Sequence, residues 1–263
     1  RSSDLIIQLF KRYTMSNTNK HYIEEEYATE QSRFFKRDIG FIFLYIFLVN
    51  ILPIIIVFLT FGLVAVFTQQ APWGFSFPIS MNISYLLAVI ISLAIFRRMH
   101  EDAFVPMIRS QIVASAKYKW HILISFTLSI VLFLLLNHFD IFALNVDSFT
   151  VFDIYPLIRE YGSISLIAIF SLTIILNTLI CQLIFRHILI QELSRLIPLK
   201  ITIVLSVILE TLYYYPYINT WWEFIPALIL ASSATYLYLK SNRNFMVSYF
   251  YQLAVILVLH IFM

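Results

Sequence analysis

Residues 177–200, NTLICQLIFRHILIQELSRLIPLK, place polar and charged side chains at the end of a long apolar run. The run reaches Cys181 and Gln182, and Phe185 and Arg186 follow before a second apolar run begins. Polar groups inside a membrane helix are costly and mark a functional site by default. We therefore predict that the rest of the chain is arranged around this stretch, which would turn from one membrane helix into the next.

The composition indicates the class of protein. Of the 263 residues, 60% are hydrophobic and 13% are charged, and the mean hydropathy is +0.84. Soluble domains carry about one quarter charged residues, so this composition is typical of a polytopic helical membrane protein. The single cysteine, Cys181, excludes a disulfide within the chain.

Seven apolar segments follow a polar N-terminal arm at residues 1–38. They lie at about residues 39–67, 79–96, 121–137, 162–184, 199–215, 222–239 and 245–262. A helix of roughly 17–25 residues crosses the ~30 Å hydrocarbon core of a bilayer. We therefore predict an all-α fold of seven transmembrane helices, with residues 39–263 forming a single membrane domain.

The basic residues predict the orientation of these helices. Of the 18 Lys and Arg residues, seven precede the first segment, five lie in residues 97–120, three in 185–200 and two in 240–244. The alternate loops hold only Arg159. Because cytoplasmic loops carry the excess of Lys and Arg, we expect a multi-pass protein of the cell membrane with a cytoplasmic N-terminus and an external C-terminus.

Three connecting segments have features of their own. Residues 97–120 are basic with apolar residues at helical spacing, which predicts an interfacial helix against anionic lipid. Loop 138–161 combines acidic and aromatic residues and would dip into the external interface or dock a partner. The aromatic run 213–224 suits anchoring at the external interface, with a partner-binding surface as the alternative.

Three features follow one another along the chain: Phe185 and Arg186 after an apolar run, the later stretch SVILETLYYYPY (206–217) and a last apolar helix. The order of these features resembles the CPBP family. This family comprises the bacterial relatives of the CAAX prenyl endopeptidases. Its motifs are Glu-Glu followed three residues later by Phe-Arg, then Phe-x-x-x-His, then His with Asn four residues on. The resemblance implies a CPBP-like core at about residues 162–256, in which the family's carboxylates and histidines would activate a water for peptide hydrolysis.

The positions that would carry this chemistry hold other residues. Cys181 and Gln182 stand where the resemblance implies the two glutamates. Tyr213 or a neighbour replaces the first histidine, and Tyr251 replaces the last. Tyrosine, with a pKa near 10, does not replace a histidine base at neutral pH. The pattern favours a non-proteolytic family member, in which Arg186 keeps a structural role at the cytoplasmic interface or on carbonyl groups of the helix end.

Glu210 is the only carboxylate well inside an apolar segment, which makes it a catalytic candidate. It would be a repurposed acid or base that faces Cys181, Gln182 and Arg186. The alternative is a protonated or tyrosine-bonded glutamate that fixes helix packing, since Tyr213 stands one turn away. Cys181 is a second catalytic candidate as an acyl acceptor, although a buried, unreactive cysteine is the commoner case.

The same residues predict which ligands and partners the protein binds. We expect Gln182, Arg186, Tyr213 and Tyr251 to bind a substrate or lipid. In lipoprotein N-acylation, Cys181, Arg186 and Glu210 would line the cavity that holds the lipid. No histidine pair has metal-ligand spacing and no glycine-rich phosphate loop occurs, so we expect neither a metal nor a cofactor. Membrane lipids and a protein partner are expected, and nucleic acid is not, because the basic residues flank membrane segments.

Three functions stay open on this basis. The first is a non-proteolytic CPBP-like membrane protein that acts with an envelope enzyme or lipoprotein in cell-envelope or lipoprotein processing in a Gram-positive bacterium. Family members of this kind include the membrane component of the staphylococcal lipoprotein N-acylation system. The second is an intramembrane peptidase with a rearranged active site, and the third is a bacteriocin self-immunity protein.

Overall fold

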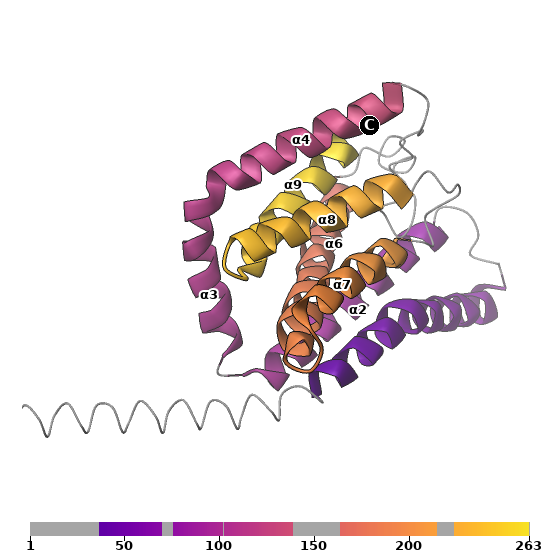
Figure 1. Cartoon of the computed structure of the whole chain (residues 1–263). Helices are drawn as coiled ribbons and strands as arrows, with labels where there is room; N and C mark the ends of the chain where they lie inside the picture. The colour runs from indigo at the N-terminus through magenta and orange to yellow at the C-terminus, as the bar shows by residue number, and fades with distance from the viewer. Residues whose placement is uncertain (1–36, 70–75, 102, 139–163, 215–223, 263) are drawn as a thin grey trace, which may run out of the picture. The chain divides into compact units, whose positions relative to one another are not determined.

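The computed structural model describes residues 37–69, 76–101, 103–138, 164–214 and 224–262, which form helices and turns without a strand among them (Figure 1). The chain divides into two compact units after Phe41, and the contacts described below lie within the second unit, Ile42–Met263. The predictions for the N-terminal arm through residue 36, for loop 139–163 and for the aromatic residues 215–223 lie outside the described residues.

Each of the seven predicted apolar segments contains a helix. The first is Arg37–Thr68, which continues through Pro53. The others are α2 (Ser76–Met99), α4 (Lys119–His138), α6 (Ile164–Gln182), α7 (Leu199–Tyr213), α8 (Phe224–Lys240) and α9 (Phe245–Phe262). Apolar runs fold this way because a helix satisfies all of its backbone polar groups internally. The all-α class is confirmed for the described residues.

Four helical stretches of the described chain are long and apolar enough to cross a membrane: Arg37–Thr68, Phe77–Met99, Phe104–Leu136 and Ile167–Arg195. The apolar helices α8 and α9 are shorter. In the most apolar window of Phe104–Leu136, 11% of residues are buried, against 50% in Phe77–Met99. Most of α4 therefore offers apolar surface to its surroundings, as contact with lipid requires. Membrane localisation fits these helices, and seven crossings remain a prediction.

The structure corrects the prediction of a turn after Arg186. The helix α6 instead continues as a π-helix, Leu183–Glu192, and then as a 3-10 turn, Leu193–Arg195. Nine of the ten π-helical residues are buried. Buried backbone groups have no water to bond, so continued helical hydrogen bonding satisfies them where an open turn would not.

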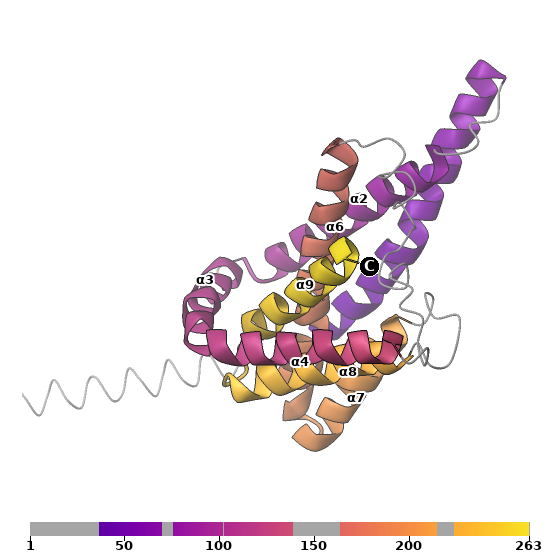
Figure 2. The same cartoon turned by 90° about the horizontal axis from the view of Figure 1, so that it is seen from above.

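The interfacial helix predicted within residues 97–120 corresponds to α3 (Phe104–Ser115). A 3-10 turn, Ala116–Tyr118, joins it to α4, and the chain changes direction there (Figures 1 and 2). The apolar core lies around α9, which packs against α4, α6 and α8. Its residues Tyr251 and Val255 are buried in one cluster with residues of α4 and α8. This packing fixes the register in which α9 presents its polar residues to α6 and α7.

Candidate functional site

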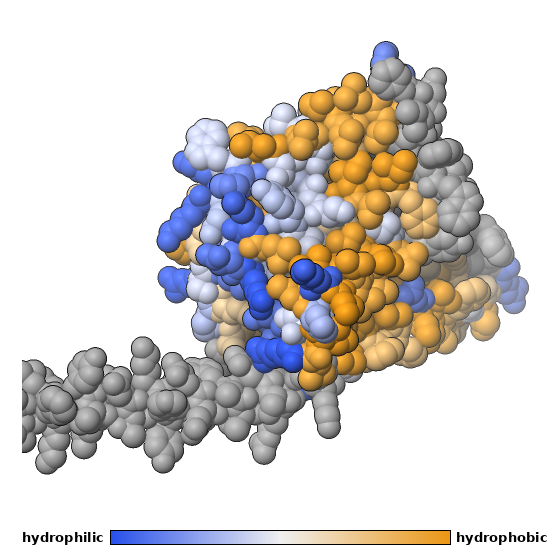
Figure 3. Space-filling model, viewed as in Figure 1, coloured by the Kyte–Doolittle hydropathy of each residue, from blue (hydrophilic) through white to orange (hydrophobic). Residues whose placement is uncertain are grey.

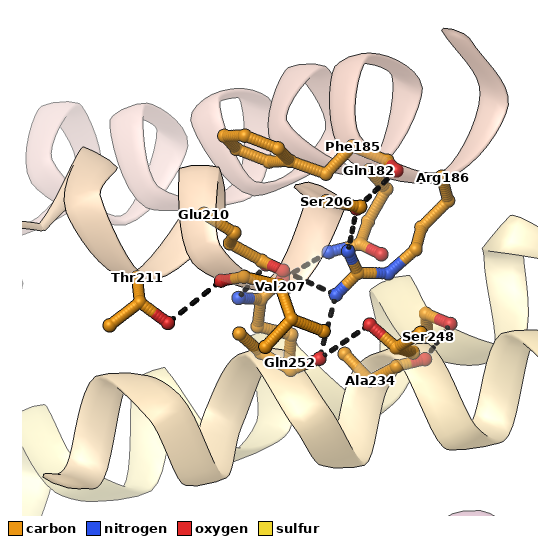
Figure 4. A network of polar contacts seen from close by, with 12 residues as sticks. Gln182, Phe185, Arg186, Ser206, Val207, Glu210, Thr211, Ala234, Ser248 and Gln252 are labelled. Atoms are coloured by element: carbon orange, nitrogen blue, oxygen red, sulfur yellow. Dashed lines mark hydrogen bonds and ion pairs between the residues drawn. The ribbon is translucent and has the colours of Figure 1, made fainter. Parts of the chain in front are cut away.

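The π-helix Leu183–Glu192 positions Arg186. A π-helix is wider than an α-helix and frequently occurs at functional sites when it interrupts one. Arg186 and Gln182, which lies one turn earlier, are both fully buried. Figure 4 shows that their side chains point toward Glu210 of α7 and Gln252 of α9. Four polar side chains from three parts of the chain thus meet inside the helical bundle.

The guanidinium of Arg186 has three partners. Its Nη2 lies 2.5 Å from Glu210 Oε2 and donates to the carbonyl oxygen of Ala231 on α8 at 3.1 Å. Its Nη1 donates to Ser206 Oγ at 3.1 Å. The Ser206 hydroxyl in turn donates to the carbonyl oxygen of Phe185 at 2.7 Å. The ion pair therefore connects the π-helix with α7 and α8.

Gln252 joins α9 to this network. Its Nε2 donates to Glu210 Oε1 at 3.0 Å and to the Tyr214 hydroxyl at 3.1 Å. Its Oε1 accepts a hydrogen bond from Gln182 Nε2 (Figure 4). Each oxygen of the Glu210 carboxylate thus has a donor, one cationic and one neutral. A buried carboxylate needs this pairing, because desolvation of an unpaired charge is far more costly than that of a paired one.

Two atoms of the network are buried without a hydrogen-bond partner in the described part of the chain. They are Arg186 Nε, a donor, and Gln182 Oε1, an acceptor. Because these two atoms lack partners, the hydrogen-bonding capacity of the network is not fully used. Each unsatisfied buried polar atom costs about 1–3 kcal/mol. The ion pair itself is neutral overall, and both oxygens of the Glu210 carboxylate already have a donor.

A second polar cluster surrounds Asn177 of α6. The hydroxyls of Tyr45 and Tyr85 donate to Asn177 Oδ1 at 2.9 and 3.0 Å. The Tyr213 hydroxyl lies 3.0 Å from that of Tyr45 and 3.1 Å from that of Tyr85, and 3.3 Å from Asn177 Oδ1. An amide oxygen has two lone pairs, so two of the three hydroxyls donate to it at a time, and the third donates to a neighbouring phenol oxygen. One asparagine thereby ties four helices together.

A cavity adjoins Asn177 among α2, α6, α7 and α9. Its polar lining comes from Asn82, Tyr85, Thr173, Asn177, Thr178 and Cys181. Its remaining lining residues are Phe170, Ile174, Tyr214 and Ile256, so none of its walls carries a charged side chain. Amide, hydroxyl and thiol groups among apolar walls suit a neutral hydrogen-bonding group, such as an ester, amide or hydroxyl, attached to an apolar chain.

The structure brings three of the predicted site residues together. Gln182, Arg186 and Glu210 belong to one network, with Gln252 as its link. Arg186 is fully buried, so the expectation that it reaches the membrane interface is wrong. Glu210 bonds to Arg186 and Gln252 and not to the neighbouring tyrosine, because those two side chains converge on it from other helices.

The other predicted residues lie elsewhere. Cys181 is buried and lines the cavity, while Tyr213 belongs to the Asn177 cluster. Tyr251 is buried against α4, where its hydroxyl lies 2.6 Å from Ser129 Oγ. Of the residues expected to line a cavity, Cys181 lines the one beside Asn177, and Arg186 and Glu210 do not.

Sequence reasoning missed Gln252, Ser206 and Asn177. A signal for the first two is present, because polar residues recur at a spacing of four on three apolar segments: 182 and 186, 206 and 210, 248 and 252. This spacing places each pair on one helix face. Among the described residues, no group of three or more His, Cys, Asp or Glu side chains is arranged to hold a metal ion. His187 instead packs among the rings of Phe96, His100 and Phe245.

No protein-family model, curated protein or solved structure matches this chain.

Proposed function

We propose that this protein is a non-proteolytic, CPBP-like integral membrane protein that holds a lipid-linked substrate for a partner enzyme in lipoprotein or cell-envelope processing. Lipoprotein N-acylation is the process that we put first. The partner supplies the bond-making chemistry, and this chain supplies the binding site within the membrane.

One observation carries the proposal: the carboxylate of Glu210 is bound by Arg186 and Gln252 (Figure 4). A general base must lie within hydrogen-bond reach of a water that it activates and must be free to take up a proton. Here one carboxylate oxygen lies 2.5 Å from the Arg186 guanidinium and the other accepts from Gln252, so the side chains of the network occupy the positions that a water would take. This arrangement supports a structural role for Glu210 in place of the role of a repurposed acid or base.

The cavity beside Asn177 supports the binding role. Its uncharged polar walls match the ester or amide linkage of a diacylglyceryl group better than they match a charged peptide terminus. It adjoins apolar residues of α6 and α9, Ile174 and Ile256, along which an acyl chain would lie. In this proposal the N-terminus is cytoplasmic and the C-terminus external, in keeping with the position of 17 of the 18 basic residues on one side of the predicted topology.

The test compares lipoproteins from cells with and without this chain. If the proposal holds, loss of the chain leaves lipoprotein N-termini with a free amino group, which mass spectrometry of the amino-terminal lipopeptides detects as the loss of one acyl group. A Thr178→Val variant, which removes a hydroxyl from the cavity wall at constant shape, is expected to restore acylation incompletely. Leu212→Ala, at a position exposed on α7, serves as the control and is expected to restore it fully.

Three results would each overturn this proposal. Unchanged lipopeptides together with the absence of a co-purifying envelope protein would remove both the process and the partner. Peptide cleavage that requires a metal ion and disappears in Glu210→Gln would instead establish the rearranged peptidase. Protection of a sensitive cell from one peptide by expression of this chain alone would establish immunity.

A further inference from the structure

A polar pocket lies between α3 and the turn that joins α8 to α9. Its lining includes Ser110, Lys117, Ser241, Asn242, Arg243 and Asn244. It shares no residue with the Arg186–Glu210 network or with the cavity beside Asn177. Two basic side chains from distant parts of the sequence thus face one polar hollow, and the function proposed above makes no use of them.

Hydrogen bonds hold the walls of this pocket in place. Gln111 Oε1 accepts from the backbone N–H of Phe245 at 3.0 Å, and the Gln111 carbonyl oxygen accepts from Asn244 Nδ2 at 2.9 Å. Asn244 Oδ1 accepts from the N–H of Met246 at 3.0 Å and so caps the start of α9. Ser241 and Asn244 are 3% and 6% exposed. The floor of the pocket is therefore made of buried, hydrogen-bonded polar groups, and exposed side chains such as Lys117 and Arg243 stand around it.

The pocket is strongly positive for its size. Lys117 and Arg243 are exposed, and neither belongs to an ion pair within the described chain, where the pairs are Arg186–Glu210 and Arg195–Glu192. The sequence has no Asp or Glu between residues 103 and 139 or between 224 and 263. With no carboxylate on the elements that form it, the pocket presents two cations that have no ion-pair partner among the described residues.

The backbone of the turn places Arg243 at a conformational cost. Asn242 and Arg243 have φ angles of 56° and 63°, in the left-handed region that arginine rarely adopts. The N–H of Arg243 donates to the carbonyl oxygen of Tyr238 at 2.9 Å, which ends α8 in a manner usually served by glycine. A strained backbone conformation at a pocket indicates that the side chain it places there has a function.

The surroundings of the pocket combine polar and apolar surface. Figure 3 shows hydrophilic residues gathered over α3 and the turn between α8 and α9, next to hydrophobic surface over α4 and α8. Val113 and Trp120 are 70% and 63% exposed nearby in the sequence. Lys119 Nζ lies 5.7 Å from the Trp120 ring centroid. Exposed tryptophan with adjacent basic residues is typical of the level at which lipid headgroups lie.

We propose that this pocket binds the phosphate group of an anionic membrane phospholipid. Arg243 supplies paired N–H donors that match phosphate oxygens, and Lys117 supplies a second positive charge. The acyl chains lie along the exposed apolar residues of α4. A soluble phosphate compound offers the same phosphate chemistry, but the adjoining apolar surface favours the lipid.

The experiment titrates the full-length chain, purified in a neutral detergent, with phosphatidylglycerol and counts the bound lipid by native mass spectrometry. Lys117→Gln and Arg243→Gln are each expected to weaken binding about fivefold, and together about 25-fold. Each basic residue near anionic lipid contributes about fivefold to the binding constant. The matched control is Arg98→Gln with Lys200→Gln, which removes two exposed charges outside the pocket. The control is expected to bind as the unmodified chain does.

Arg243→Gly separates binding from folding, because glycine adopts a positive φ without strain and the variant is expected to be at least as stable. Its lipid affinity is still expected to fall about fivefold. Unchanged affinity in the double pocket variant, or an equal loss in the control, overturns the proposal. Displacement of the lipid by millimolar inorganic phosphate would also overturn it in favour of a soluble phosphate ligand.

Discussion

Arg186 and Glu210 stand 24 residues apart in the sequence and meet as an ion pair of 2.5 Å in which neither side chain is exposed. Burying two charges costs more than their mutual attraction returns unless further hydrogen bonds complete the pair. Here Ser206, Ala231 and Gln252 supply them. The pair and its hydrogen-bonding partners therefore act as one unit that connects the π-helix, α7, α8 and α9.

The first prediction concerns this unit. Arg186→Met leaves the Glu210 carboxylate buried without a cation and is expected to lower the free energy of unfolding by about 3–5 kcal/mol. The double variant Arg186→Met with Glu210→Leu removes both charges and is expected to recover most of that loss. Unfolding in a series of SDS–detergent mixtures measures both. A double variant no more stable than the single one would contradict this account.

Gln252 is the subject of the second prediction. Gln252→Leu withdraws the donor to Glu210 Oε1 and the acceptor of Gln182, so we expect a loss of about 1–3 kcal/mol. Gln191→Leu is the control, because the contacts of Gln191 are long, at 3.3 and 3.4 Å, and contribute little. The same unfolding assay compares the two. Equal losses would show that Gln252 has no special part in the network.

Asn177 should matter more than any one of its phenolic partners. Asn177→Leu leaves the hydroxyls of Tyr45 and Tyr85 without their acceptor, and a loss of about 2–3 kcal/mol is expected. Tyr85→Phe removes a single donor and is expected to cost about 0.5–1.5 kcal/mol. Thermal unfolding in detergent, followed by loss of helical circular dichroism, distinguishes these magnitudes. The reverse order would place the stabilisation in the tyrosines themselves.

Thiol modification of Cys181 reports on access to the cavity beside Asn177, since Cys181 is the only cysteine of the sequence and is 2% exposed. We expect a bulky maleimide to leave it unmodified in native membranes and to modify it fully after denaturation in SDS. Intact mass gives the fraction modified. Rapid modification of the native protein would mean that the cavity beside Asn177 opens widely enough to admit a large molecule.

The proposed orientation can be tested with introduced cysteines in a Cys181→Ala background. A membrane-impermeant maleimide added to intact cells is expected to label Asn219→Cys, in a loop predicted to be external, and not Lys200→Cys. After permeabilisation both are expected to react. The opposite pattern would reverse the proposed topology.

The helices could be predicted from the sequence, because each apolar run is long enough to form a helix that is buried in the protein or faces lipid. The sequence did not allow the end of α6 to be predicted. Residues 187–199 mix polar and apolar side chains, which is typical of a turn. The π-helix there packs against α7 and α9 and bonds to α8 through Arg186, and no local pattern records these contacts.

The candidate site was predictable only in part, because the partners of its side chains also depend on how the helices pack. Glu210 and Arg186 were conspicuous as charges in apolar surroundings, and the spacing of four residues between Ser248 and Gln252 was visible in the sequence. The partner of each tyrosine was not, because many tyrosines lie at similar positions and small differences in helix rotation choose between them. Tyr251 faces Ser129 of α4, whereas Tyr213 faces Asn177 of α6.

The neutrality of the Arg186–Glu210 pair has an electrical consequence. A lone charge that moves across a bilayer exchanges about 2.3 kcal/mol with the field for each 100 mV of membrane potential. An arginine without its carboxylate would make the π-helix responsive to voltage, as in the arginine-rich helices of voltage sensors. With Glu210 2.5 Å away, a membrane field would act on the small dipole of the pair and not on a lone charge, so we expect this part of the protein to be insensitive to depolarisation of the cell.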